Sequence, residues 1–177
     1  MDGLHIFGKK SPEKHTNHID YHFDELISPI SHLITDYHWL LNQVIFNHVA
    51  YDGDTFDDYE NKYDKIIIQT EETFHIELTA KGFLNKYAKF IQGDWDAIYG
   101  LRNPINIKDL IKYKRILWWN RKILNIDKTF IENNSEIYFS CVDAAYWEIY
   151  SKNEEILNIF AEKFPNHQRI NLNNNKY

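Results

Sequence analysis

The sequence is poor in the residues that mark cross-linked or loop-rich folds. Of 177 residues, one is cysteine, four are proline and six are glycine. Because Cys141 stands alone, the chain forms no internal disulfide and nothing in it requires an oxidising compartment. So few glycines and prolines argue against a repetitive fold. A phosphate-binding glycine loop, a G-x-S-x-G motif and paired cysteines are also absent, which disfavours the common nucleotide-binding enzymes and hydrolases.

Long apolar runs are missing as well. No apolar segment approaches the length of a membrane-spanning helix. The first residues, MDGLHIFGKKSPEK, lack the apolar stretch of a signal peptide. We therefore predict a cytoplasmic protein without a membrane partner.

Positive charge is in deficit, because 20 lysines and arginines stand against 26 aspartates and glutamates, for a net charge of −6. The best basic cluster is interleaved with aromatic residues and comprises Lys108, Lys112, Tyr113, Lys114, Arg115, Trp118, Trp119, Arg121 and Lys122. Phosphate recognition needs such clustering, so a nucleic-acid surface stays open as an interpretation. We favour solvated charges beside a buried strand and predict no nucleic-acid partner. The acidic excess favours a basic protein partner or simple solubility.

Apolar and aromatic residues are plentiful. Hydrophobic residues make up 44% of the chain and aromatic residues 16%, which is enough for a substantial core and a recognition surface. A chain of 177 residues fits one domain, so we predict a single domain over 1–177. Within it, the polar, histidine-rich residues 1–23 form a short strand or a loosely attached arm, and residues 171–177 form a disordered tail.

The clearest folding pattern lies between residues 135 and 164. Apolar and polar residues alternate over 137–142, which predicts a half-buried strand, and aromatic residues over 146–150 predict a second strand. Ser151 or Asn153 can cap a helix that begins with acidic residues. The apolar stripe of that helix predicts its extent as 153–164.

Hydrophobic spacing predicts further elements along the chain. Helices are expected at 28–35 (with Ser28 as cap and Pro29 in first position, or with a start at Asp24), at 80–92 and at 108–113. Strands are expected at 37–49, 65–70, 73–78, 115–119 and 128–131, with Asn133 and Asn134 as a turn and 94–104 as a connection. Short turns make consecutive strands antiparallel. We predict an α+β fold, an antiparallel sheet with helices packed mainly on one face.

Histidine is abundant, with nine residues. His15, His18 and His22 are spaced three and four apart, with Asp20 and Asp24 nearby. On a helix, His18 and His22 would share a face and could chelate a metal. The H-E-x-x-H pattern of zinc proteases is absent, and the spacing matches no closed set of four ligands. We predict no structural metal site and no cofactor.

Residues 51–60, YDGDTFDDYE, which we call the acidic segment, are the strongest candidate for a functional surface. Hard cations prefer such oxygen ligands, but Gly53 comes too early for a calcium-binding loop. One interpretation is a solvated loop. The other is a docking surface for a basic protein, in which acids surround aromatic anchors. The predicted partner-binding residues are Tyr51, Asp52, Asp54, Phe56, Asp57, Asp58, Tyr59 and Glu60.

Two pairs of side chains could act as acid and base. His75 and Glu77 share one face of their predicted strand, and Asp143 and Glu148 flank the break between two strands. Polar faces of strands carry such residues routinely, so neither pair is predicted to be catalytic. Cys141 is expected to be a small buried residue rather than a nucleophile.

The segment CVDAAYWEIYSKNEEILNIFAEKF, from Cys141 to Phe164, resembles the closing strand-and-helix part of many small uncharacterised bacterial proteins. Some of these are immunity proteins of toxin systems, which are generally compact, acidic and non-catalytic, and which cover the active site of a cognate toxin. The resemblance implies an inhibitor of this class. It carries no catalytic motif, and it assigns no role to any single residue.

Two functional hypotheses follow from these observations. The first is a non-catalytic protein-binding module, specifically an immunity protein that inhibits a basic toxin. The second is a small metal-assisted enzyme built on histidine, aspartate and glutamate. Binding to the product of a neighbouring gene would favour the first hypothesis, and a metal held by His18 and His22 would favour the second. The oligomeric state is left open.

Overall fold

A computed structural model describes residues 1–8, 21–42, 49–50, 52–53, 55, 66–69, 75–79, 84, 87–91, 97–105, 125–142 and 146–174. In chain order, with η for a 3-10 helix, its elements are β1 (Asp2–Phe7), α1 (Phe23–Ile27), η1 (Ser28–Leu33), β2 (His38–Asn42), β3 (Ile66–Gln69), β4 (His75–Thr79), η2 (Ala88–Phe90), β5 (Ala97–Leu101), α5 (Asn125–Asn134), β6 (Ser135–Val142), β7 (Tyr146–Ser151), α6 (Glu154–Lys163) and β8 (His167–Asn171).

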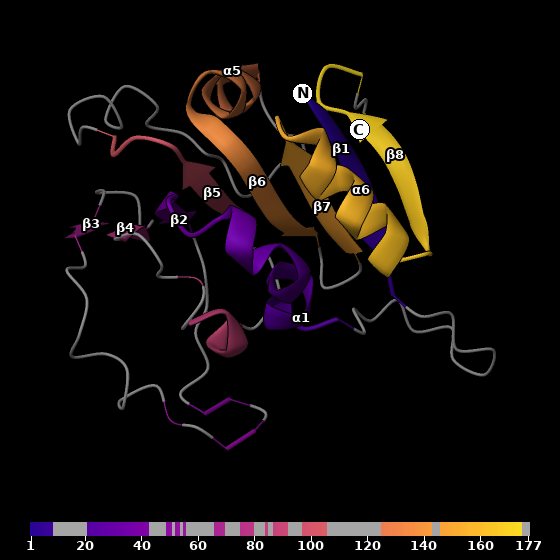
Figure 1. Cartoon of the computed structure of the whole chain (residues 1–177). Coiled ribbons are helices and arrows are strands. Elements are labelled where there is room, and N and C mark those ends of the chain that lie inside the picture. The colour runs from indigo at the N-terminus through magenta and orange to yellow at the C-terminus, as the bar shows by residue number, and fades with distance from the viewer. Residues whose placement is uncertain are drawn as a thin grey trace.

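The strands among these residues form one sheet with the order β3-β4-β2-β5-β6-β7-β1-β8 (Figure 1). Every neighbouring pair is antiparallel. The predicted α+β class is therefore confirmed. The described parts of the strands predicted at 37–49, 65–70 and 73–78 are strands β2, β3 and β4, and the predicted pair 137–142 and 146–150 is β6 and β7.

Strand β1 lies inside the sheet, between β7 and β8. Leu4 and Ile6 are buried and stand opposite Ile149 and Trp147 of β7, so residues 2–7 are a short strand and not a loosely attached arm. Gly3 is needed for close approach, because a Cβ there would meet the carbonyl oxygen of Ile149 and come within 2.6 Å of the Tyr150 ring.

The end of the described chain is also part of the fold, so the disordered tail predicted at 171–177 does not begin at residue 171. Asn171 is the last residue of β8, and the next residue, Leu172, is fully buried. The Leu172 amide donates a hydrogen bond of 2.9 Å to the carbonyl oxygen of Met1. The polar composition of this stretch predicted disorder, but Asn171 pairs with Asp2 of β1, and the amides of Asn173 and Asn174 donate to the side-chain and backbone oxygens of Asn171. Residues 175–177 lie outside the described residues.

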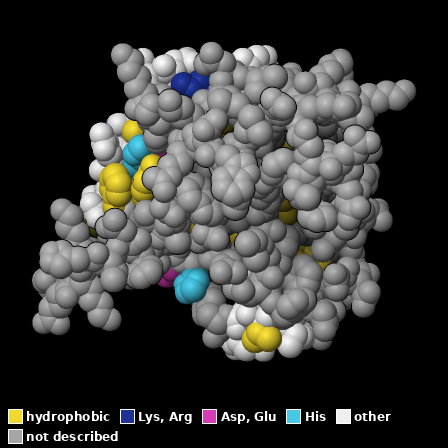
Figure 2. All heavy atoms as spheres, turned by 180° about the vertical axis from the view of Figure 1, so that it is seen from behind, with side chains coloured by type: hydrophobic (Ala, Val, Ile, Leu, Met, Phe, Trp, Pro, Cys, Tyr) yellow, Lys and Arg dark blue, Asp and Glu magenta, His cyan; other side chains and the backbone are white. Residues whose placement is uncertain are grey.

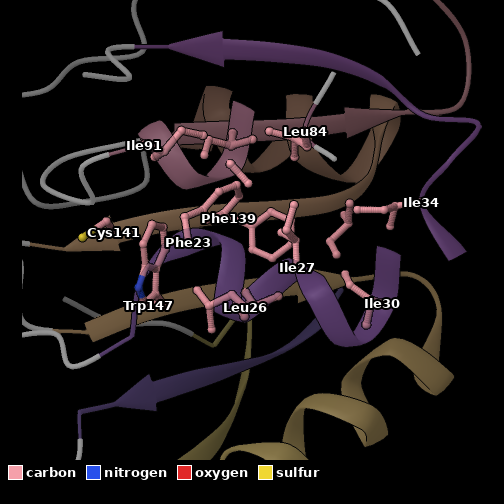
Figure 3. Packing of buried hydrophobic residues seen from close by; sticks show 14 of the residues in the cluster. Phe23, Leu26, Ile27, Ile30, Ile34, Leu84, Ile91, Phe139, Cys141 and Trp147 are labelled. Atoms are coloured by element: carbon pink, nitrogen blue, oxygen red, sulfur yellow. The ribbon is translucent and has the colours of Figure 1, made fainter. Parts of the chain in front are cut away.

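One face of the sheet carries the main core, under α1, η1, η2 and α6 (Figures 1 and 3). The ring of Phe23 packs edge-on against Phe139 of β6, with centroids 5.2 Å apart, and lies 5.2 Å from the Trp147 ring of β7. Leu26, Ile27 and Ile30 extend this cluster along α1 and η1 (Figure 3). Burial of these large side chains supplies most of the driving force for joining the helices to the sheet.

Helix α6 confirms the helix predicted at 153–164. Its N-cap is Asn153, whose side-chain oxygen accepts a hydrogen bond of 2.9 Å from the Glu155 amide. Ile156, Leu157 and Phe160 are buried on the predicted apolar stripe. A cap, an acidic first turn and a stripe with helical period all act locally, which is why this helix could be predicted.

The first helix begins earlier than the preferred prediction of 28–35. It starts at Phe23, one residue before the alternative start at Asp24, and its N-cap is His22. Glu25 reaches back to accept a hydrogen bond of 2.8 Å from the His22 amide. Ser28 and Pro29 instead open the 3-10 helix η1, where the missing N–H of proline costs nothing.

Helix α5 covers the opposite face of the sheet and corrects the strand predicted at 128–131. Phe130 and Ile131 are buried there, and Phe130 packs edge-on against Tyr99 of β5 at 5.4 Å. Asn133 and Asn134, predicted as a turn, are the last residues of this helix. A short apolar group beside polar residues is compatible with a strand or with a helix. In the structure a helix forms, and its Phe130 and Ile131 pack in one cluster with the tyrosines of β5 and β6.

Strand β5 replaces the connection predicted at 94–104. All its residues are buried between β2 and β6. A Cβ on Gly100 would come within 2.6 Å of Ile137 and 2.9 Å of Trp39. Of the helix predicted at 80–92, the structure describes Leu84 and residues 87–91, which include η2. The elements predicted at 108–113 and 115–119 lie outside the described residues, as does the basic cluster of residues 108–122 that spans them.

Candidate functional site

The acidic segment is described at Asp52, Gly53 and Thr55, together with residues 49 and 50 just before it. The other predicted partner-binding residues lie outside the described residues: Tyr51, Asp54, Phe56, Asp57, Asp58, Tyr59 and Glu60. Their role in binding therefore stays a prediction.

The described part of this segment is a tight turn attached to the core. The Gly53 amide donates a hydrogen bond of 2.9 Å to the Ala50 carbonyl oxygen. Gly53 has a φ of 89°, a conformation that favours glycine, and Val49 and Thr55 form an isolated antiparallel bridge across the turn. Ala50 is buried in the main core, whereas Val49 beside it is 55% exposed. The turn thus holds an apolar side chain in water next to acidic residues.

Asp52 is exposed and forms an ion pair with Lys89 of η2, with 3.4 Å between Oδ2 and Nζ. The Lys89 amino group also lies 5.5 Å from the centre of the Phe90 ring, which is buried in the core. An ion pair in contact with water contributes little to stability. Its effect is to tie the acidic segment to η2.

The predicted metal ligands are not brought together in the described part of the chain. His22 caps α1, and His15, His18 and Asp20 lie outside that part. The described residues hold no group of three or more side chains that could bind a metal ion. His75 and Glu77 belong to β4, whose side chains are not described. The absence of a structural metal site stays a prediction.

Glu148 has a partner that the sequence did not indicate. Its predicted partner, Asp143, lies outside the described residues. Instead, Glu148 on β7 stands directly opposite His5 on β1, and its Oε1 atom is 2.8 Å from Nε2 of the imidazole. The side chain of Glu148 is 2% exposed and that of His5 is 13% exposed. An acid and a base thus meet within the sheet, and only the base is open to water.

Aromatic rings flank the imidazole. The Tyr146 ring lies 4.9 Å from the His5 ring, the Phe7 ring packs edge-on at 6.0 Å, and these two aromatic rings are 5.7 Å from each other. Figure 2 shows the back of the molecule, where hydrophobic side chains gather around a histidine at the surface. The group His5, Glu148, Phe7 and Tyr146, which we call the dyad site, is therefore partly apolar.

The strand register extends the dyad site into a polar row. Gln168 of β8 stands opposite His5, and Ser140 of β6 stands opposite Glu148 on its other side. Strand alternation predicts that His5 faces away from Leu4 and Ile6, but the sequence does not show which residue of another strand it meets. That is why sequence reasoning found Glu148 and missed His5.

A second polar cluster lies at Tyr37, before β2. Glu136 of β6 accepts a hydrogen bond of 3.3 Å from Arg102 and lies 3.6 Å from the amino group of Lys152. Burial raises the pKa of the Tyr37 hydroxyl, and the negative charge of Glu136 raises it further, while Arg102 acts in the opposite direction. Cys141 is buried on β6, as predicted for a small core residue.

No family model matches this chain, and comparisons with curated proteins and with solved structures found no match. Among the described residues, no helix is both long and apolar enough to cross a membrane.

Proposed function

We propose that this chain is a non-catalytic protein-binding module that acts in the cytoplasm as an immunity protein, inhibiting a basic bacterial toxin through the acidic segment. A net charge of −6, aromatic residues at 16% and the composition of residues 51–60 support the proposal. The partner is a basic protein, because acidic residues attract such a surface over distances comparable with the Debye length.

The observation that carries the proposal is the exposure of the Val49 side chain beside Ala50, which is buried in the main core. Large apolar side chains in water are common singly, but this one adjoins a run of acids and aromatics. Interfaces use apolar and aromatic anchors for affinity and surrounding charges for association rate. Val49, Phe56 and Tyr59 are the proposed anchors, and the acids around them steer the partner.

The first experiment uses surface plasmon resonance to compare rates of association with the product of the neighbouring gene, which the proposal expects to be the toxin. Asp57→Asn with Asp58→Asn removes two charges from the acidic segment. Glu155→Gln with Glu162→Gln removes two charges from exposed positions of α6 and serves as the matched control. We expect the first double variant to associate more slowly and with a flatter salt dependence, and the control to behave like the parent.

The second experiment concerns the anchors. Phe56→Ala should leave the association rate unchanged and speed dissociation about tenfold, which corresponds to a loss of about 1.4 kcal/mol. If neither the Asp57/Asp58 variant nor Phe56→Ala altered binding to a toxin that the parent inhibits, the acidic segment would be only a solvated loop.

A further inference from the structure

Glu148 occupies a costly position. A carboxylate removed from water requires compensation by a charged partner or by hydrogen bonds. The structure supplies His5 at 2.8 Å, but a buried ion pair is often no more stable than two well-packed apolar side chains in the same place. A buried carboxyl group in contact with a partly exposed imidazole also has the geometry in which an acid–base group is held in position.

The two members of this pair differ in their access to water. Glu148 is the inner group and His5 is the outer one. An ionised carboxylate can only accept hydrogen bonds, so with Glu148 ionised the contact requires a proton on Nε2 of His5. The described part of the chain gives Nδ1 of His5 no hydrogen-bond partner. A carboxylate thus orients an imidazole whose second nitrogen can accept a proton, which is how general bases are held in position.

We propose that the dyad site binds a small molecule with an apolar or aromatic body and an acidic hydroxyl group, and that His5 is the proton acceptor for this hydroxyl. The body of the ligand lies against Phe7 and Tyr146, and the hydroxyl donates to Nδ1 of His5. On transfer, the O–H bond breaks, the electron pair stays on oxygen and an N–H bond forms. The carboxylate of Glu148 stabilises the resulting imidazolium.

This site is independent of the proposed toxin-binding surface. It shares no residue with the acidic segment, and its main residues lie on β1 and β7 at the other end of the sheet from β3. Either proposal can therefore fail without affecting the other.

The first test measures the tautomer of His5 by long-range proton–nitrogen NMR on the full chain labelled at histidine nitrogens. His5 should carry its proton on Nε2. His167 is an internal reference of the opposite kind, because its Nδ1 lies 2.8 Å from the Phe164 carbonyl oxygen, which can only accept. His5→Gln identifies the His5 signals. A proton on Nδ1 of neutral His5 would overturn the proposal.

The second test measures ligand binding with two probes, phenol and toluene, which share an aromatic ring and differ in the hydroxyl group. Phenol should shift the Nδ1 resonance of His5, and its affinity should exceed that of toluene about tenfold, as one hydrogen bond worth roughly 1.4 kcal/mol predicts. No shift with phenol, or equal affinity for both probes, would exclude the proposed site on the unaltered protein.

Variants separate the dyad from general charge effects. Glu148→Gln keeps an acceptor for Nε2 but removes the charge that supports proton acceptance, so phenol should bind more weakly. Glu136→Gln removes a carboxylate from another ion-paired cluster on the same sheet and should leave phenol binding unchanged. Unchanged phenol binding in Glu148→Gln, or an equal loss in Glu136→Gln, would contradict the role of Glu148. The comparison of the two probes on the parent remains decisive if Glu148→Gln does not fold.

Discussion

At the scale of single residues, Tyr37 shows how packing and charge combine. Its ring packs near Trp39 at 6.1 Å, and it is buried enough to raise the pKa of the hydroxyl above the ordinary 10.0. Desolvation is the main cause, and Glu136 adds to it. The folded state therefore holds this proton more tightly than the unfolded state does. The contribution of Tyr37 to stability is complete below pH 10.0 and is lost as the pH rises toward the folded-state pKa.

Tyr37→Phe tests this residue because it keeps the ring and removes the hydroxyl. At neutral pH the variant should lose at most about 1 kcal/mol, the typical net value of one hydrogen bond. Above pH 10.0 the parent should lose stability more steeply than the variant, since the variant has no hydroxyl to titrate. Urea unfolding across this pH range measures both effects, with Tyr21→Phe as control. Parallel stability curves for parent and Tyr37→Phe would contradict the raised pKa.

At the scale of elements, local patterns predicted α6 and the strands β2, β3, β4, β6 and β7, whereas long-range contacts decided α5 and β5. Asn153, the acidic first turn and the apolar stripe specify α6 within its own residues. The segment around Phe130 has no such local specification, and the tyrosines of β5 and β6 select a helix there. The candidate site follows the same rule, because Glu148 is visible as an acid in a strand, while its contact with His5 depends on register.

Helix α6 offers the clearest test of an element. Phe160 is fully buried, and its ring lies 6.2 Å from Phe139 of β6 and 6.0 Å from Phe164. Phe160→Ala should lower the free energy of unfolding by about 3–5 kcal/mol, through lost burial and the cavity that remains. Glu162→Ala in the same helix changes an exposed residue and should alter it by less than about 0.5 kcal/mol. Equal effects of the two changes in chemical denaturation would mean that α6 does not dock through this face.

At the scale of the whole molecule, the sheet joins the two ends of the described chain. β1, from the beginning of the chain, separates β7 from β8, and Met1 accepts a hydrogen bond from Leu172. The residues of the dyad are 143 positions apart in sequence. Closing so long a loop costs entropy that is recovered only when β1 pairs with both neighbours. The dyad site therefore forms only when β1 has paired with β7.

Removal of residues 1–8 tests this arrangement. The truncated chain loses Leu4 and Ile6 from the core, worth about 1.5–3 kcal/mol each, and loses the strand that pairs with both β7 and β8. Since a domain is stable by only about 5–15 kcal/mol, we expect the truncated chain to melt without a cooperative transition or at a much lower temperature.

Removal of residues 175–177 is the control for a terminal truncation and should leave the melting temperature unchanged. A synthetic peptide of residues 1–8 should restore part of the lost stability, because it can pair with β7 on one side and with β8 on the other. An unchanged transition without residues 1–8 would mean that β1 lies on the sheet as an appendage, and it would remove the structural basis of the dyad site as well.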